Sequence, residues 1–207
     1  MTDATAARNK AEAETSKARA VLGFLQDMMS AADPNRDGKD VKIAELLERA
    51  SAALPNTETL KDKPLIEAAV RQAMAETYHG LGMPDRAVEE FKRAIELQEA
   101  NEETVSKDRI INMHALGTSL LTLGRLDEAQ RIVEEAMSLL GVTKSAEISD
   151  EPTAELLGLY NLILGSRGQF QDMIPNARRR LAFYDRTYGR ADWRTVRDER
   201  PLRRAGS

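Results

Sequence analysis

The chain has 207 residues and a formal net charge of −4; 31% of its residues are charged and only 4% are aromatic. The absence of cysteine excludes a disulfide scaffold and a thiolate metal site. The presence of only two histidines excludes a histidine-rich metal centre. The acidic balance disfavours generic nucleic-acid binding, and no apolar run approaches the roughly 20 residues of a membrane-spanning helix.

The composition favours helices, because sheets prefer β-branched and aromatic residues. The first residues lack the apolar stretch of a signal peptide, so we expect a cytoplasmic protein.

Residues 1–60 predict an N-terminal helical element. Apolar residues spaced by three and four indicate a helix over about 8–30, and a second helix follows over about 41–54. The turn between them, residues 33–38, matches the first half of a calcium-binding loop. Its twelfth position is Ala44, where such a loop needs a glutamate, so we expect a simple turn.

From Pro64 onward the sequence repeats itself at a shift of 42 residues. Both copies carry small and bulky residues at the same offsets of 0, 3, 7, 12, 16 and 19. A small residue allows two helices to cross closely, a bulky one fills the neighbouring space, and the glycine lets the chain turn back. The expected repeat-packing residues are Ala75, Tyr78, Gly82, Ala87, Phe91 and Ala94, then Gly117, Leu120, Gly124, Ala129, Val133 and Ala136.

A weaker third copy places Gly168 at the turn, 44 residues beyond Gly124. The sequence therefore predicts about three hairpins within 64–188, which must stack because one hairpin cannot bury its apolar face alone. Their predicted ranges are 64–101, 104–141 and 153–188.

The last segment, 189–207, is predicted to be an Arg-rich tail or a truncated fourth repeat. From Arg178 to the end there are ten arginines against four acidic residues. We expect Pro175 to shorten the last hairpin helix to the residues after it. We also expect the open end of the array to be covered, either by Trp193 and Leu202 or by a partner or second copy. An alternative is that this basic, aromatic segment binds nucleic acid or anionic lipid.

The repeated offsets resemble the tetratricopeptide repeat (TPR), with a small residue, a large one three positions later, and then A-x3-F-x2-A. The 42-residue period resembles the longer kinesin-light-chain-like subclass. The residues around Tyr188-Gly189 resemble its linker, although the His-Pro of that linker is missing. The resemblance implies an all-α fold of antiparallel helix hairpins, stacked in a right-handed α-solenoid.

In TPR arrays, four positions on the first helix of each repeat face the ligand in a concave groove. Carried over to this sequence, the resemblance implies a mildly polar, mostly uncharged groove that suits an extended or helical peptide. The Lys/Asn set that binds chaperone C-termini is absent from these positions. The candidate groove residues are Gln72, Glu76, His79, Ile111, His114, Thr118, Leu121 and Leu162.

Catalytic and metal-binding residues are not predicted. His79 and His114 are expected about 10 Å apart along neighbouring helices, too far to share one ion. The pairs Glu89-Glu90 and Glu134-Glu135 are expected on exposed helix faces. Because no Ser/His/Asp set has a motif context, we predict a protein that is not an enzyme and needs no cofactor.

Residues 10–140 carry a narrower resemblance. The phrases FLQDMMSAADP and IAELLERA are similar to the segment that follows the kinase domain and membrane span in bacterial eukaryotic-like serine/threonine kinases with C-terminal TPR arrays. The phosphate loop, HRD and DFG motifs of the kinase domain are absent from this sequence. The resemblance implies a regulatory or docking segment, which would be extracytoplasmic if it is part of a membrane-anchored kinase.

The function predicted from the sequence is therefore a non-catalytic scaffold that binds a protein or peptide partner in its groove, within a bacterial signalling system. The alternative is self-association through the N-terminal helix or the open C-terminal edge, which would give a homodimer. Nucleic acid is not an expected partner.

Overall fold

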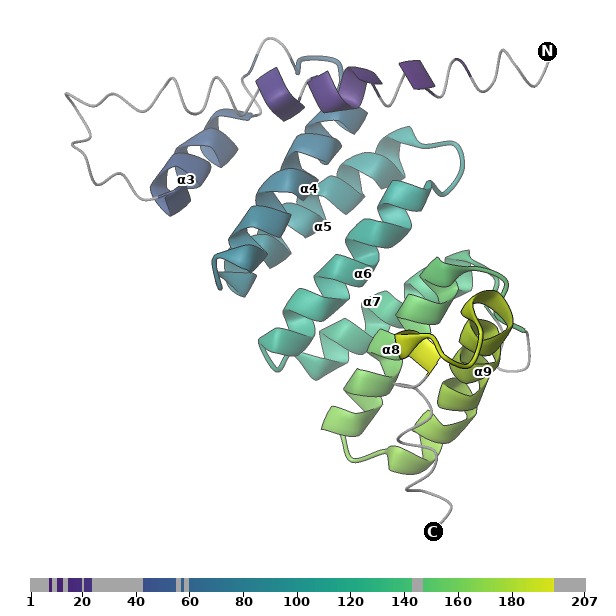
Figure 1. The fold of residues 1–207 in the computed structure, drawn as a ribbon. Coiled ribbons are helices and arrows are strands. Elements are labelled where there is room, and N and C mark those ends of the chain that lie inside the picture. Colours follow the sequence, from purple (N-terminus) through teal and green to yellow (C-terminus); the bar gives the residue numbers. More distant parts are fainter. Residues whose placement is uncertain are drawn as a thin grey trace. The chain divides into compact units, whose positions relative to one another are not determined.

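The computed structural model consists of helices and their connections (Figure 1), and this confirms the predicted all-α class. It divides into two compact units, Met1–Thr104 (unit 1) and Val105–Ser207 (unit 2), which are described separately. The calcium-like turn at 33–38 and Leu202 lie outside the residues that the structure describes. The described residues are 8, 11–12, 15–19, 21–23, 43–54, 57, 60–142 and 147–195.

Unit 1 contains the helices α3 (Ile43–Ala53), α4 (Pro64–Gly80) and α5 (Pro84–Asn101), and α4 and α5 form an antiparallel hairpin (Figure 1). A proline opens both α4 and α5, where its fixed φ suits the first helical turn and its missing N–H is no loss. Between them, Gly82 has a φ of 74°, a conformation that glycine adopts without strain.

The core of unit 1 lies between α4 and α5. Ala75 and Ala87 are fully buried, so the two helix backbones approach closely at this point. Tyr78 and Phe91 fill the adjacent space and are each 2% exposed. The shorter α3 adds Leu47 to this core, and burying a leucine side chain contributes about 1.5–3 kcal/mol.

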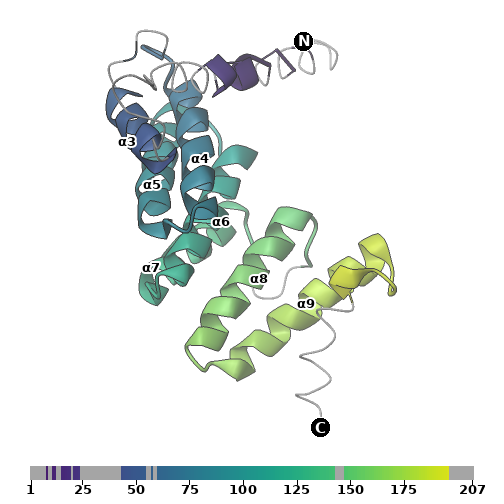
Figure 2. The same ribbon diagram turned by 60° about the vertical axis from the view of Figure 1, so that its left-hand side comes forward.

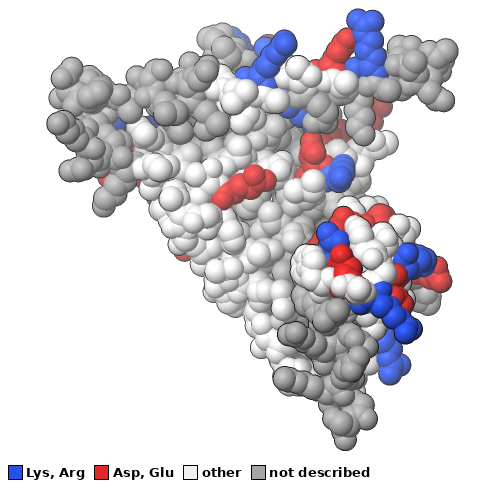
Figure 3. Space-filling model, in the orientation of Figure 1, with Lys and Arg blue, Asp and Glu red and all other residues white. Residues whose placement is uncertain are grey.

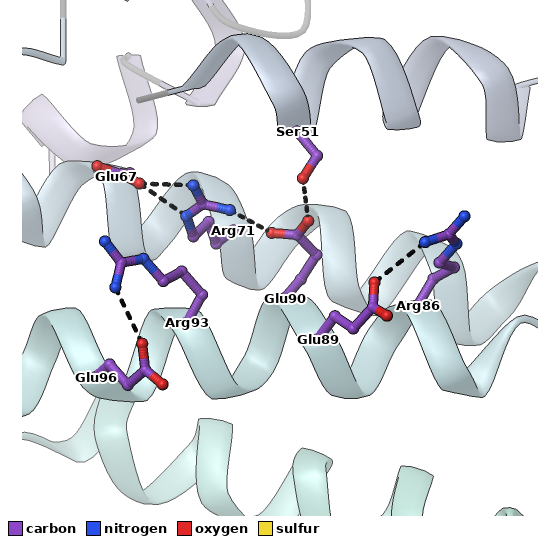
Figure 4. A network of polar contacts seen from close by, with 8 residues as sticks. All are labelled: Ser51, Glu67, Arg71, Arg86, Glu89, Glu90, Arg93 and Glu96. Atoms are coloured by element: carbon purple, nitrogen blue, oxygen red, sulfur yellow. Dashed lines mark hydrogen bonds and ion pairs between the residues drawn. The ribbon is translucent and has the colours of Figure 1, made fainter. Parts of the chain in front are cut away.

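A buried polar network joins α3, α4 and α5 (Figure 4). The guanidinium of Arg71 lies 2.8 Å from carboxylate oxygens of both Glu67 and Glu90. Glu90 also accepts a hydrogen bond from the hydroxyl of Ser51 on α3. The side chains of Arg71 and Glu90 are only 7% and 8% exposed. The expectation that Glu90 is exposed is therefore wrong, because its side chain faces α3 and α4.

Unit 2 contains two hairpins, α6 (Lys107–Thr122) with α7 (Leu126–Leu139) and α8 (Glu151–Ser166) with α9 (Phe170–Tyr188); the second is seen clearly in Figure 2. Side chains cap the first helix of each hairpin. The Ser106 hydroxyl accepts from the backbone N–H of Arg109, and the Asp150 carboxylate accepts from that of Thr153.

The two hairpins of unit 2 pack together, since α8 contacts both α6 and α7. Gly117 on α6 makes this close packing possible. A Cβ atom at this position would lie 3.0 Å from side-chain atoms of both Val133 on α7 and Leu159 on α8. Leu120 and Ala129 are fully buried beside it. The small residue that the repeat pattern places here thus serves packing within a hairpin and between hairpins.

Two expectations for the end of unit 2 are wrong. Helix α9 begins at Phe170 and continues through Pro175. Asn161 on α8 donates to the carbonyl of Met173 and accepts from the amide of Asn176, so α8 holds both sides of the proline in place. Trp193 is 61% exposed and therefore does not cover the end of the unit.

Candidate functional site

The candidate groove residues of unit 1 follow one face of α4. The Gln72 side chain is half-buried and donates a hydrogen bond of 3.0 Å to the Glu76 carboxylate, which is exposed. His79 is exposed one turn further along the helix. This part of α4 therefore presents a polar, accessible surface with one negative charge.

The candidate groove residues of unit 2 lie on α6 and α8, which pack against each other. Glu155, Gly158 and Leu162 recur at helical spacing on α8, and the charge of Glu155 acts on His114 of α6, so the two rows adjoin. Most of the surface over α6 in Figure 3 is uncharged. We call this surface the α6–α8 face and define it by Ile111, His114, Thr118, Leu121 and Leu162.

Two large apolar side chains of the α6–α8 face are open to solvent. Leu162 is 60% exposed and Ile111 is 38% exposed, whereas Thr118 and Leu121 are half-buried. The Thr118 hydroxyl donates to the carbonyl of His114 within α6 and so adds no strong polar feature. The face can therefore offer apolar contacts beside a single imidazole.

His114 is the titratable group of the α6–α8 face. Burial lowers the pKa of its imidazole below the ordinary value, and the nearby carboxylate of Glu155 opposes this shift. The folded protein therefore favours the neutral imidazole, which can both donate and accept a hydrogen bond.

This shift predicts a dependence of stability on pH. The unfolded chain protonates His114 near pH 6.5, while the folded chain resists protonation, so the free energy of unfolding of unit 2 should fall as the pH drops below about 7. The variant His114→Gln should lose this part of the dependence. Urea unfolding between pH 7.5 and 5 measures it, and an NMR titration giving an imidazole pKa above 6.5 would contradict the prediction.

The sequence reasoning missed a buried charged residue, Arg180 on α9, which lies beside Gly158 of α8. Tyr184 on α9 is fully buried and donates a 2.8 Å hydrogen bond to Glu155. The guanidinium carbon of Arg180 lies 5.6 Å from the centre of the Tyr184 ring. It also fills the space beside Gly158, where a Cβ atom would come within 2.8 Å of it. The guanidinium thus occupies the place of the side chain that Gly158 lacks.

The hairpins that repeat in the sequence also share one turn geometry in the structure. All three hairpins turn at a glycine with φ between 71° and 74°, namely Gly82, Gly124 and Gly168. In each hairpin the next residue donates its backbone N–H to the carbonyl four residues before the glycine, at 2.9 Å. Residues 65–140 match the family model of the tetratricopeptide repeat. The chain contains TPRs.

Solved structures support the same fold for a longer part of the chain. Two crystal structures of the Podosopora anserina putative kinesin light chain nearly identical TPR-like repeats, one of them of a point variant, align with TM-scores of 0.62 and 0.63. Both are 17% identical in sequence, and each alignment covers 92% of this chain and 84% of the other. No curated protein matches the chain.

Comparing equivalent positions of the three hairpins explains the contact between Gly158 and Arg180. The position of Gly158 carries Gln72 in the first hairpin and His114 in the second, whereas the position of Arg180 carries alanine in both. The third hairpin has exchanged the large and the small residue, and the Arg180 guanidinium lies where a side chain at position 158 would begin.

Metal-binding and membrane-spanning features are not found in the described part of the chain. Its His, Asp and Glu side chains form no group of three that could hold a metal ion. No helix there has both the length and the apolar character that a bilayer crossing requires.

Proposed function

We propose that this chain is a non-catalytic protein-interaction module that binds a peptide or protein segment on the α6–α8 face. The observation that carries the proposal is the pair of exposed apolar side chains, Ile111 on α6 and Leu162 on α8, on two helices that pack against each other. Stacked helical repeats present extended surfaces of this kind to their ligands. Apolar anchors beside a few polar groups suit recognition of an amphipathic helix or an extended peptide.

We propose further that the partner belongs to a bacterial signalling system linked to a serine/threonine kinase. The support is the resemblance of residues 10–140 to the segment that follows the membrane span in such kinases. In unit 1, the accessible α4 residues Gln72, Glu76 and His79 offer a separate polar surface for a ligand.

A peptide selection tests the binding function. Peptides selected on the full chain from a random library should bind at least about tenfold more weakly to the double variant Ile111→Asp/Leu162→Asp, because both apolar anchors become charged. Binding is measured by fluorescence anisotropy of the labelled peptide, and circular dichroism checks that the helices persist.

A matched control is available on another helix of the same unit. Leu139 and Leu140 at the end of α7 are 38% and 36% exposed. The variant Leu139→Asp/Leu140→Asp makes the same chemical change away from the proposed face, so it should bind the selected peptides as the original chain does. Equal weakening by the two double variants would overturn the assignment of the face.

Self-association is the second candidate function. Phe170 at the start of α9 is 65% exposed and Trp193 is 61% exposed, so unit 2 carries apolar surface that a second copy could cover. Light scattering over a range of micromolar concentrations tests this candidate, and a monomer throughout would reject it.

A further inference from the structure

Unit 1 contains a cavity of about 240 Å³ where α3, α4 and α5 meet. Three carboxylates line it, those of Glu48, Glu89 and Glu90, together with the phenol of Tyr78 and the guanidinium of Arg86. The lining groups come from all three of these helices. The cavity shares Glu90 and Ser51 with the buried network of Figure 4.

The charges around this cavity favour a cation. Arg86 is the single positive group among its lining residues and stands against three carboxylates. Arg71 supplies a second guanidinium behind Glu90, but it is shared with Glu67. The local sum is therefore about two negative charges, and an anionic ligand would be repelled.

Tyr78 gives an independent indication of a ligand. The residue is only 2% exposed, and in the described part of the chain nothing forms a hydrogen bond with its hydroxyl. Burial, together with the charges of Glu90 and Glu48, raises the pKa of this hydroxyl to about 12. Tyr78 lines the cavity together with all the charged residues that act on its hydroxyl. The hydroxyl is therefore available for a hydrogen bond with a ligand atom in the cavity.

The arrangement of acceptors favours one kind of cation. A metal ion is disfavoured, because the described carboxylates form no group with metal-binding geometry. A guanidinium presents a planar fork that matches a single carboxylate, whereas an ammonium is a compact charge with three donors. Here Glu48, Tyr78 and Glu89 offer oxygen atoms from three different helices. Three acceptors that approach from separate directions suit an ammonium.

We propose that this cavity binds a primary alkylammonium group, with Glu48 and Glu89 supplying the charge and the Tyr78 hydroxyl accepting one hydrogen bond. Two sources provide such a group, a lysine side chain of a partner protein and a free amine. The site is separate from the α6–α8 face and does not depend on the function proposed for that face.

Arg86 competes with the ligand. Its guanidinium lies 2.9 Å from Glu48 and 3.2 Å from Glu89 and so spans both carboxylates. All three side chains are between 45% and 65% exposed, and exposed ion pairs of this kind contribute little stability. An incoming ammonium can therefore take over these carboxylates while Arg86 turns to solvent.

The test is an NMR titration of the full chain with Nα-acetyl-lysine-N-methylamide at low ionic strength. We expect saturable shifts of the Ser51 and Tyr78 amide signals. Glu89→Gln and Tyr78→Phe should each weaken binding by roughly fivefold or more, since each removes one acceptor. Arg86→Gln should tighten binding, because it removes the competing cation.

A closely matched control lies on the same helix. Glu96 is paired with Arg93 as Glu89 is with Arg86, three residues apart, and the two carboxylates are 61% and 65% exposed. Glu96→Gln makes the same charge change outside the cavity, so it should leave binding unchanged. Equal weakening by Glu96→Gln and Glu89→Gln would overturn the proposal. So would equal binding of the Nε-acetylated probe, or the absence of saturable shifts in the original chain and in Arg86→Gln.

A second arm distinguishes the two sources of the ammonium. The tripeptide acetyl-Ala-Lys-Ala-amide and n-butylamine are titrated separately. Tighter binding of the tripeptide assigns the cavity to a partner lysine, and binding of n-butylamine that is equal or tighter assigns it to a free amine. Both results support the ammonium site, and failure of both ligands to bind rejects it.

Discussion

Replacing Arg71 by methionine should lower the free energy of unfolding of unit 1 by about 3–5 kcal/mol, because the change leaves the largely buried carboxylates of Glu67 and Glu90 without a cation. Hydrogen exchange of the α4 and α5 amides measures the loss directly in this unit.

Two further variants separate the buried charge from other effects of the substitution. Arg93→Met breaks an exposed ion pair on α5 and should cost no more than about 1 kcal/mol. The double variant Arg71→Met/Glu90→Met removes both members of the buried pair and should recover much of the loss. A loss for Arg71→Met as small as that for Arg93→Met would show that the network contributes little to stability.

Introducing glutamine at Gly158 should destabilise unit 2 by about 1 kcal/mol, since its Cβ would come within 2.8 Å of the Arg180 guanidinium and the end of this largely buried side chain must move. Glutamine is the residue that the first hairpin carries at the equivalent position. Arg180→Ala, the alanine of the first two hairpins, should restore most of that stability in the double variant. Urea unfolding of the four proteins gives the coupling between the two positions.

Helix α8 also supplies a control for this cycle. At Gly165 a Cβ atom would meet only the Met173 side chain, at an ordinary 3.5 Å. Gly165→Gln should therefore be tolerated, with or without Arg180. Additive effects of Gly158→Gln and Arg180→Ala would contradict the exchange of residues described above.

The fold class could be predicted because the repeat pattern is local. Small and bulky residues three and four positions apart define one helix face, and Gly82, Gly124 and Gly168 mark where each hairpin turns. Such a pattern depends only on helical geometry and needs no knowledge of distant contacts. The groove positions were carried over from the TPR resemblance and stay a prediction.

The buried charges escaped the sequence reasoning because they depend on contacts between helices. The sequence around Glu90 predicts an exposed residue of an acidic helix, whereas its partner Arg71 lies 19 residues earlier on another helix. Arg71 itself gave a signal, since it falls on the same stripe of α4 as the buried Ala68, Ala75 and Tyr78. A charged residue within an apolar stripe indicates a buried partner.

The errors at the end of unit 2 have the same origin. A proline at the sixth position normally disfavours a helix. Helix α9 keeps its first turns because the Asn161 side chain on the neighbouring helix donates a hydrogen bond to the backbone carbonyl of Met173. The residue type of Trp193 predicts an apolar contact. In the structure, the centre of its indole ring instead lies 5.4 Å from the guanidinium carbon of Arg194.

The exposed position of Trp193 decides what optical experiments can report. It is the single tryptophan of the sequence, and it belongs to unit 2. Its emission therefore reports on the surroundings of the end of α9, within unit 2. Fluorescence and circular dichroism give different melting curves whenever the two units unfold at different temperatures, even if each unit unfolds in a single step. A difference between the two curves is thus a property of where the reporter lies, and tyrosine-based or backbone-based signals are needed to observe unit 1.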